Sequence, residues 1–170
     1  AVERVTVDSA TGEPRLSVIG NVKPKGICGS GMISLIAELF KNGFIDPSGR
    51  LQGKPSAYIT GDGYMLADGD AGENGQPIII CETDIDNIVR AKAAIFSACR
   101  TLLASVGMDF GDLSRIYIAG GFGRYLDVAD AKTIGLIPNL PEEKFVFLGN
   151  SSLTGAYMTL MSSKSRQTQS

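Results

Sequence analysis

The chain has no histidine among its 170 residues. Histidine is the side chain that most often serves as a general base or a transition-metal ligand near neutral pH, so its absence excludes Ser-His-Asp and Cys-His catalysis within this chain. Cysteine is also scarce: there are three, at positions 28, 81 and 99, and no two form a C-x-x-C pair. This number and spacing favour a reducing compartment over a disulfide framework, and they supply no ligand set for an iron–sulfur cluster.

Long apolar runs and an excess of charge are missing as well. No stretch of about 18 uncharged apolar residues could cross a bilayer, and the first residues do not combine a basic flank with an apolar signal core. The 16 basic and 18 acidic residues give a net charge of −2 and are spread along the chain. We therefore expect no membrane or nucleic-acid partner and a cytoplasmic location.

What the sequence does contain is enough apolar material for one substantial core. Its length and its 44% of hydrophobic residues predict one globular domain, divided at most into two subdomains. The first part, residues 1–77, is expected to be a smaller α+β subdomain. It contains a hairpin around the turn at 9–14, an amphipathic helix from Ser30 to Gly43, and short strands and loops from 44 to 77.

The second part, residues 78–162, shows a more regular alternation of strand-like and helix-like segments than the first. Residues 163–170 are expected to be a polar tail. We expect, in order, a buried strand at 78–81, a helix from a Thr83–Asp86 capping box to about 106, a strand at 115–119, a short helix at 128–134, a strand at 144–148 and a helix to about 161. Strands alternating with helices predict an α/β layered fold.

Three glycines follow, within four residues, the strand that ends at Ala119, which is expected to be buried. The motif is Ala119, Gly120, Gly121, Phe122 and Gly123, and residues without a Cβ let the backbone approach a flat or charged ligand. Because open α/β sheets bind ligands at the carboxyl ends of their strands, a nucleotide would fit here; an ordinary glycine-rich turn is the alternative. Leu126 occupies the place of the third glycine of a dinucleotide fingerprint, and no Gly-Lys-Ser/Thr sequence forms a P-loop.

Lys92 falls in the middle of the apolar stripe of the long helix, between Val89 and Phe96. A cation in such a place is costly without a partner. It either reaches a ligand's phosphate, ribose or base edge, or it packs its stem on the core and extends its ammonium to water.

Other polar positions favour structural roles. Gly29, Ser30 and Gly31 could offer amides to an anion but are read as a helix cap, Cys28 as a small buried thiol, and Asn150 to Ser152 as a second cap. The acidic residues at 109, 112, 127 and 130 form no defined metal site by their spacing and are expected to be solvated.

Five motifs occur in a characteristic order along almost the whole chain. They are Lys25–Ile33, Ala91–Ile95, Tyr117–Asp127, Ile134–Pro138 and Gly149–Ala156. In this order they resemble the reductive activators of corrinoid iron–sulfur proteins and of methyltransferase corrinoid proteins, members of the acetate/sugar kinase, heat-shock cognate and actin superfamily.

The resemblance implies a two-lobed ATPase with ribonuclease-H-like sheets and ATP in the cleft between the lobes. The chain would be a partial, C-terminal actin-like lobe, with the adenosine-binding motif at Ala119–Gly123 and Lys92 on a helix that packs against the nucleotide. The resemblance assigns no catalytic or metal-binding residue to this chain. The phosphate loops and the Mg²⁺ site would lie upstream, and the iron–sulfur cluster would lie elsewhere in the parent protein.

The activity implied by the resemblance is ATP-dependent reduction of a cobalt(II) corrinoid on a partner protein, with electrons from a separate donor and a possible homodimer. The chain begins directly in strand-like sequence, which we interpret as a fragment of a longer protein, although a trimmed N-terminus would look the same. The fragment alone is expected to be inactive. Two alternatives remain: a nucleotide-independent module that docks a partner through residues 44–77, and a small-molecule kinase lobe of the same superfamily.

Overall fold

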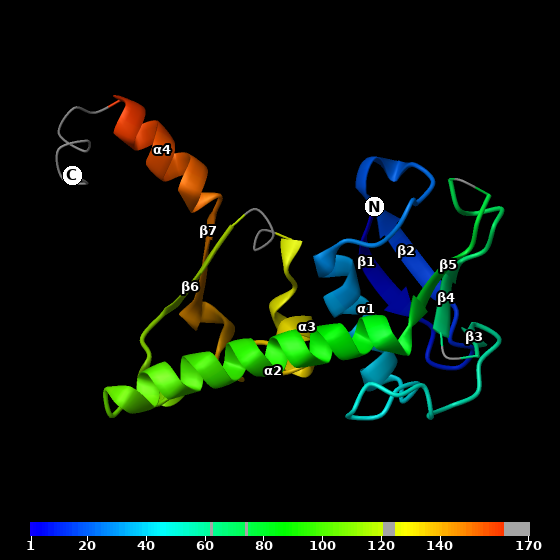
Figure 1. Cartoon of the computed structure of the whole chain (residues 1–170), viewed down its shortest axis with the longest axis horizontal. Coiled ribbons are helices and arrows are strands. Elements are labelled where there is room, and N and C mark those ends of the chain that lie inside the picture. The colour runs from blue at the N-terminus through cyan, green and yellow to red at the C-terminus, as the bar shows by residue number, and fades with distance from the viewer. Residues whose placement is uncertain (62, 74, 121–124, 162–170) are drawn as a thin grey trace.

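The computed structural model describes residues 1–61, 63–73, 75–120 and 125–161. A long helix, α2 (Glu82–Ser105), runs beneath both halves of the molecule. Strands β1 to β5 and helix α1 lie at its beginning, and β6, β7 and α4 lie towards its end (Figure 1). The two halves are therefore joined along one helix.

The N-terminal half is built on a hairpin covered by a helix. Strands β1 (Val2–Val7) and β2 (Pro14–Val18) pair antiparallel, as the alternating sequence predicts. Helix α1 (Gly29–Lys41) packs on β1, and the Ser34 hydroxyl at its centre donates to the Val5 carbonyl at 2.7 Å. Apolar residues recurring along α1 are buried against the hairpin, because one face of this helix is almost continuously apolar.

A second antiparallel sheet completes this half. It has the order β3 (Ile59–Thr60), β4 (Gly63–Ala67) and β5 (Ile78–Cys81). Strand β5 is only half-buried, contrary to the expected buried strand, since among the described residues it pairs with β4 alone and forms an edge of the sheet. Its pairing with β4 also crosses the expected boundary between residues 77 and 78, and that boundary stays a prediction.

The N-cap of helix α2 lies two residues earlier than the sequence suggested. Its N-cap is Cys81, and the capping box pairs Cys81 with Asp84, whose carboxylate accepts from the Cys81 amide at 3.0 Å. The expected box at Thr83 and Asp86 is therefore wrong: the helix already includes Thr83. The far end agrees with expectation, because Gly107 follows with a φ of 72°, the left-handed conformation that often ends helices.

The C-terminal half contains a two-stranded parallel sheet. Strands β6 (Ile116–Ala119) and β7 (Phe145–Gly149) pair side by side, with α3 (Val128–Thr133) between them in sequence and α4 (Ser151–Met161) after β7. The short 3₁₀ turns η1 (Ile19–Asn21), η2 (Phe110–Asp112) and η4 (Glu142–Lys144) lie in connections. The expected strand–helix alternation is confirmed.

Strand β6 is not fully buried, in contrast to the expectation. Its residues alternate between half-buried and exposed, and Tyr117 is 57% exposed. A parallel sheet is normally covered on both faces, whereas here β6 has a single neighbouring strand among the described residues. The best-buried side chains lie instead in the N-terminal half, where Leu35, Leu39 and Phe44 are completely enclosed.

No helix among the described residues is both long and apolar enough to span a bilayer.

Candidate nucleotide-binding site

Two glycine turns meet at the carboxyl ends of β6 and β7. The amide of Gly120 donates to the carbonyl of Gly149 at 2.7 Å. Both residues have left-handed backbone angles, with φ of 109° at Gly120 and 64° at Gly149, which only glycine adopts without strain. A Cβ at either position would meet no atom of the described residues within 4 Å. The turns therefore present open backbone at the edge of the sheet where α/β proteins bind ligands.

Helix α4 begins directly after the second turn. The side-chain oxygen of Asn150 accepts from the Leu153 amide at 3.0 Å, and the Asn150 carbonyl accepts from the Thr154 amide. The predicted cap at Asn150 is confirmed. This cap fixes where the helix starts and so where the Gly149 turn lies.

Of the five residues in the predicted adenosine motif, the structure describes two. Ala119 ends β6 in register with Gly149, and Gly120 forms the turn just described. Gly121, Phe122 and Gly123 lie outside the described residues. The motif is thus placed at a strand end, as predicted, and its binding role stays a prediction.

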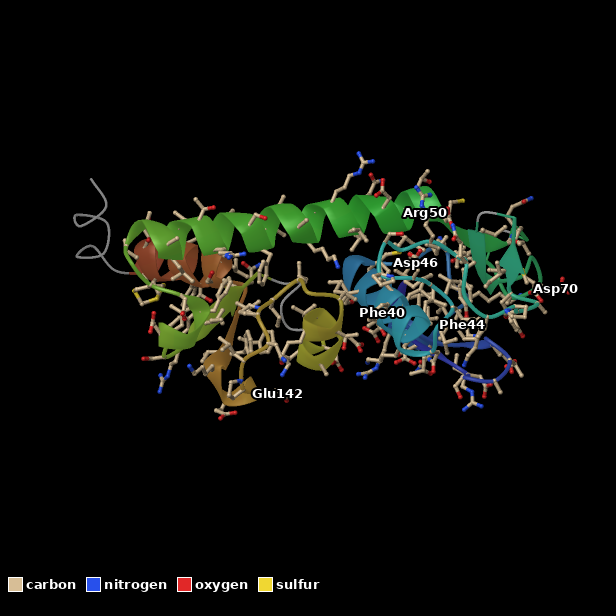
Figure 2. All side chains as sticks on the ribbon, turned by 90° about the horizontal axis from the view of Figure 1, so that it is seen from below. Phe40, Phe44, Asp46, Arg50, Asp70 and Glu142 are labelled. Carbon is tan, nitrogen blue, oxygen red and sulfur yellow. The ribbon has the colours of Figure 1, made fainter. Side chains whose placement is uncertain are left out.

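Lys92 has a partner within the protein. Its ammonium donates to the carbonyl of Ile134, the residue that follows the last turn of α3. It also borders a pocket of about 170 Å³ between α1, α2 and α3, which Phe40 and Asp46 help to line (Figure 2) and which contains neither Ala119 nor Gly120. Lys92 therefore connects α2 with α3, and its contact with a nucleotide stays a prediction.

The start of α1 differs from the expected cap. Cys28, not Ser30, occupies the N-cap position. Ser30 is buried in the first turn, with its hydroxyl 3.1 Å from the Cys28 sulfur. Cys28 is half-buried rather than buried. The prediction of a Ser30 cap is wrong because the chain already turns helical at Gly29, where the Cys28 amide bonds to the Val2 carbonyl of β1.

This geometry lowers the pKa of the Cys28 thiol. Burial raises the pKa of Cys28, but hydrogen bonds from Ser30 and from the first amides of α1 outweigh it and hold the pKa below its ordinary 9.0. We expect alkylation of Cys28, followed at the peptide level by mass spectrometry, to reach its half-maximal rate below pH 9.0. Ser30→Ala should move that midpoint upwards; an unchanged midpoint in this variant would contradict the assigned cause.

The acidic residues were expected to be solvated, and for Asp130 this is wrong. Asp130 is 4% exposed and lies 2.7 Å from the Lys41 ammonium. Asp127 caps α3 and pairs with Arg4 at 3.0 Å. Asp109 and Asp112 are exposed and form the capping box of η2. Among the described residues no group of three or more cysteines or acidic residues could hold a metal ion.

Comparison with known proteins identifies the family. Over its whole length, residues 1–170, the chain matches a family described as the C-terminal domain of RACo, the ASKHA domain. The chain belongs to this family. Its fold is accordingly that of an actin-like ASKHA domain, which confirms both the resemblance and the α/β fold class inferred from the sequence.

Individual relatives of the family agree with this assignment. The chain is 36% identical over 174 residues to the corrinoid activation enzyme RamQ of Eubacterium limosum, covering 95% of the chain and 29% of RamQ. It is 34% identical over 128 residues to the [Co(II) methylated amine-specific corrinoid protein] reductase of Methanosarcina barkeri, covering 75% of the chain and 21% of that protein.

A solved structure is also similar. The reductive activator for corrinoid, iron–sulfur protein superposes with a TM-score of 0.90 at 42% sequence identity, over 98% of this chain and 27% of that one. The chain thus spans less than a third of the length of the relatives it matches.

Proposed function

We propose that this chain is the C-terminal part of an ATP-dependent reductive activator, which drives reduction of the cobalt(II) corrinoid on a partner methyltransferase or corrinoid iron–sulfur protein. The observation that carries the proposal is the match of 98% of the chain, at 42% identity and a TM-score of 0.90, to a reductive activator for corrinoid, iron–sulfur protein. The names of the two other relatives, a corrinoid activation enzyme and a Co(II) corrinoid protein reductase, support the same function.

Within such an activator, this chain supplies the adenosine side of the ATP site. The turns at Gly120 and Gly149 support this role, because they lie together at the carboxyl ends of parallel strands and a Cβ on either would meet none of the described atoms within 4 Å. A flat base and its ribose can approach backbone that no side chain shields. Gly121, Phe122, Gly123 and Lys92 are the further residues proposed for this site.

Mg²⁺ and the phosphates are proposed to be held outside this chain. Mg²⁺ needs oxygen ligands such as carboxylates, and the described acidic residues bind helix termini, lysines and arginines rather than converging on one point. The iron–sulfur cluster is likewise proposed for another part of the protein. The full protein is proposed to work in the cytoplasm with a separate electron donor and a possible homodimeric assembly.

The physical role proposed for the activator is to couple the free energy of ATP hydrolysis to the reduction of the corrinoid. Bound ATP supplies the free energy of its hydrolysis, and a bound ligand shifts a protein between two states only as far as its affinities for them differ. The glycine turns of this chain would bind the adenosine, and ATP binding and hydrolysis would shift the activator and its corrinoid partner between states. Hydrolysis of ATP, in the part of the site outside this chain, would then make these changes of state proceed in one direction.

The glycine turn can be tested by adding a side chain to it. In the complete protein, Gly120→Val is expected to weaken ATP binding at least tenfold, about 1.4 kcal/mol, because a branched side chain would stand in the space left for the adenosine. The matched control is Gly20→Val, since Gly20 also has a left-handed φ of 79° and open space at its Cβ. Isothermal titration with ATP measures both variants.

Equal ATP affinities for the wild type and Gly120→Val would contradict the site. So would equal losses in the two glycine variants, because these would reflect backbone strain alone. Lys92→Ala is expected to weaken ATP binding as well. If it lowers only the thermal stability, then Lys92 serves solely as the donor to the Ile134 carbonyl.

A further inference from the structure

The C-terminal half exposes an apolar surface without a single charged residue. The 4, 5 and 11 residues of β6, β7 and α4 include no Asp, Glu, Lys or Arg, although 20% of the chain is charged. Large apolar side chains are nevertheless exposed on these elements: Tyr117, Leu153 and Tyr157 are each more than half exposed. Contiguous exposed apolar surface of this kind marks an interface rather than an ordinary solvated surface.

Helix α4 extends from the end of β7 without burying any of its 11 residues (Figure 1). Leu153 and Tyr157 lie one turn apart on the same face of this helix, and both side chains are exposed. An isolated helix of this length is marginal in water. A contact on the face that carries Leu153 and Tyr157 would therefore stabilise α4.

An apolar pocket lies on the other side of the β6–β7 pair, against the second half of α2. Its volume is about 300 Å³, and none of the described residues that line it is charged. Ile116 of β6 points into this pocket together with Cys99 and Leu102 of α2, whereas the next residue of β6, Tyr117, faces the opposite way because successive side chains alternate along a strand. Both faces of this parallel pair are thus left partly uncovered, and parallel sheets are normally covered on both.

The composition of this surface favours a permanent contact. Interfaces that form and dissociate resemble the rest of a protein surface and keep charged residues, whereas permanent interfaces are as apolar as a domain core. The chain matches the C-terminal domain of its family. It superposes over 98% of its length, with a TM-score of 0.90, on a solved activator of which it covers only 27%. The same arrangement therefore occurs in a polypeptide most of which lies outside the matched part.

We propose that in the complete protein the polypeptide that precedes this C-terminal domain covers the apolar surface. It packs on Tyr117 of β6 and on Leu153 and Tyr157 of α4, and its apolar side chains fill the pocket beside Cys99. The contact forms on folding and is permanent. This inference goes beyond the proposed function, because it requires the chain to be part of a longer protein but does not require that protein to bind ATP.

Cys99 provides the first test, because its thiol is exposed in this structure and would be shielded in the complete protein. N-ethylmaleimide is expected to modify Cys99 of the complete protein at least about tenfold more slowly than Cys99 of the same protein unfolded in urea, since the reaction requires the interface to open. Mass spectrometry of the peptides measures both rates.

The matched control is Ser97→Cys in a Cys99→Ser background. Position 97 is also exposed and lies on the opposite side of α2, because two residues are about 200° apart around a helix. The thiol introduced there should react at almost its rate in the unfolded protein. Equal protection at positions 97 and 99, or no protection at position 99, overturns the inference.

Other occupants of the surface would give different results. If a second copy of the protein covered it, the protection of Cys99 would be lost on dilution of the protein. If the corrinoid protein covered it, the protection would appear only after that protein had been added. Either result overturns the inference, whereas protection that depends on neither dilution nor the corrinoid protein supports it.

Amide hydrogen exchange at α4 provides a second measurement that needs no substitution. In the complete protein the amides of α4 are expected to exchange at least about a hundredfold more slowly than those of an unfolded chain. Exchange within about tenfold of the unfolded rate, as for a helix of this length without contacts, overturns the inference. Failure of this proposal is distinct from failure of the ATP site: an unprotected Cys99 with ATP binding that Gly120→Val abolishes rejects the interface alone, and a protected Cys99 in a protein that binds no ATP rejects the site alone.

Discussion

Lys41→Met is expected to lower the free energy of unfolding of the N-terminal half by about 3 kcal/mol, because it leaves the carboxylate of Asp130 buried without its partner. Asp130 is 4% exposed and its only ion-pair partner among the described residues is Lys41, at 2.7 Å. Breaking a buried pair from one side typically costs 3–5 kcal/mol. We expect about the lower limit of this range, since the Lys41 side chain is itself 40% exposed and water can partly replace it.

The double variant Lys41→Met/Asp130→Leu is the matched control. Replacing both members of a buried pair by apolar residues of similar size is often nearly neutral, so most of the lost stability should return. Hydrogen exchange of the complete protein, read by mass spectrometry in peptides from β1, α1 and α3, gives the local opening free energies. A loss below about 1 kcal/mol in Lys41→Met would mean that Asp130 regains water easily and that the pair does not hold α3.

The pair should be insensitive to pH over the physiological range. Burial lowers the pKa of Lys41, but the hydrogen bond and attraction from Asp130, with a smaller contribution from Glu38, raise it above 10.5. A folded-state pKa above the unfolded value means that the stabilisation is complete below pH 10.5 and is lost as the pH rises through the folded value. The Lys41→Met effect should therefore be equal at pH 6 and pH 8.

Local sequence signals were sufficient for most of the secondary structure. Period-two alternation found the β1–β2 hairpin, and helical periodicity found α1 and α2. The start of α2 was missed because cysteine is not among the usual capping residues. The wrong cap of α1 has a similar origin, since a bond from the Cys28 amide to β1 sets the start of that helix.

Contacts between residues far apart in the sequence could not be predicted from local patterns. The position of α3 depends on pairs such as Arg4–Asp127 and Lys41–Asp130, and no local pattern links residues so far apart. Aspartate side chains are mostly exposed, and nothing in the sequence around Asp130 marks it as an exception. Its burial could therefore not be predicted. At the candidate site, the strand end at Ala119 and Gly120 was predicted from the glycines alone, whereas the meeting of Gly120 with Gly149 required the parallel pairing of β6 and β7.

Gly31→Ala is expected to destabilise the protein although it replaces a glycine inside a helix. An exposed helical glycine usually gains about 1 kcal/mol on becoming alanine. A Cβ at Gly31, however, would lie 2.5 Å from the carbonyl oxygen of Val2 and 2.7 Å from the side chain of Ile27. That carbonyl accepts from the Cys28 amide at 2.9 Å, and the Val2 amide donates to Gly26 at 2.8 Å, so β1 cannot yield without losing hydrogen bonds.

Overpacking of this kind costs about 1–3 kcal/mol, and we expect a net loss of about 2 kcal/mol for Gly31→Ala. Gly155→Ala in α4 is the matched comparison, because Gly155 is also helical and its Cβ would meet nothing within 4 Å; this variant should gain up to about 1 kcal/mol of helix stability. Hydrogen exchange at α1 and at α4 measures the two changes. A loss of stability in Gly31→Ala together with a gain in Gly155→Ala would show that α1 is held at its N-terminus by close contact with β1. A gain of stability in both variants would mean that β1 shifts to make room and that packing does not require a glycine at position 31.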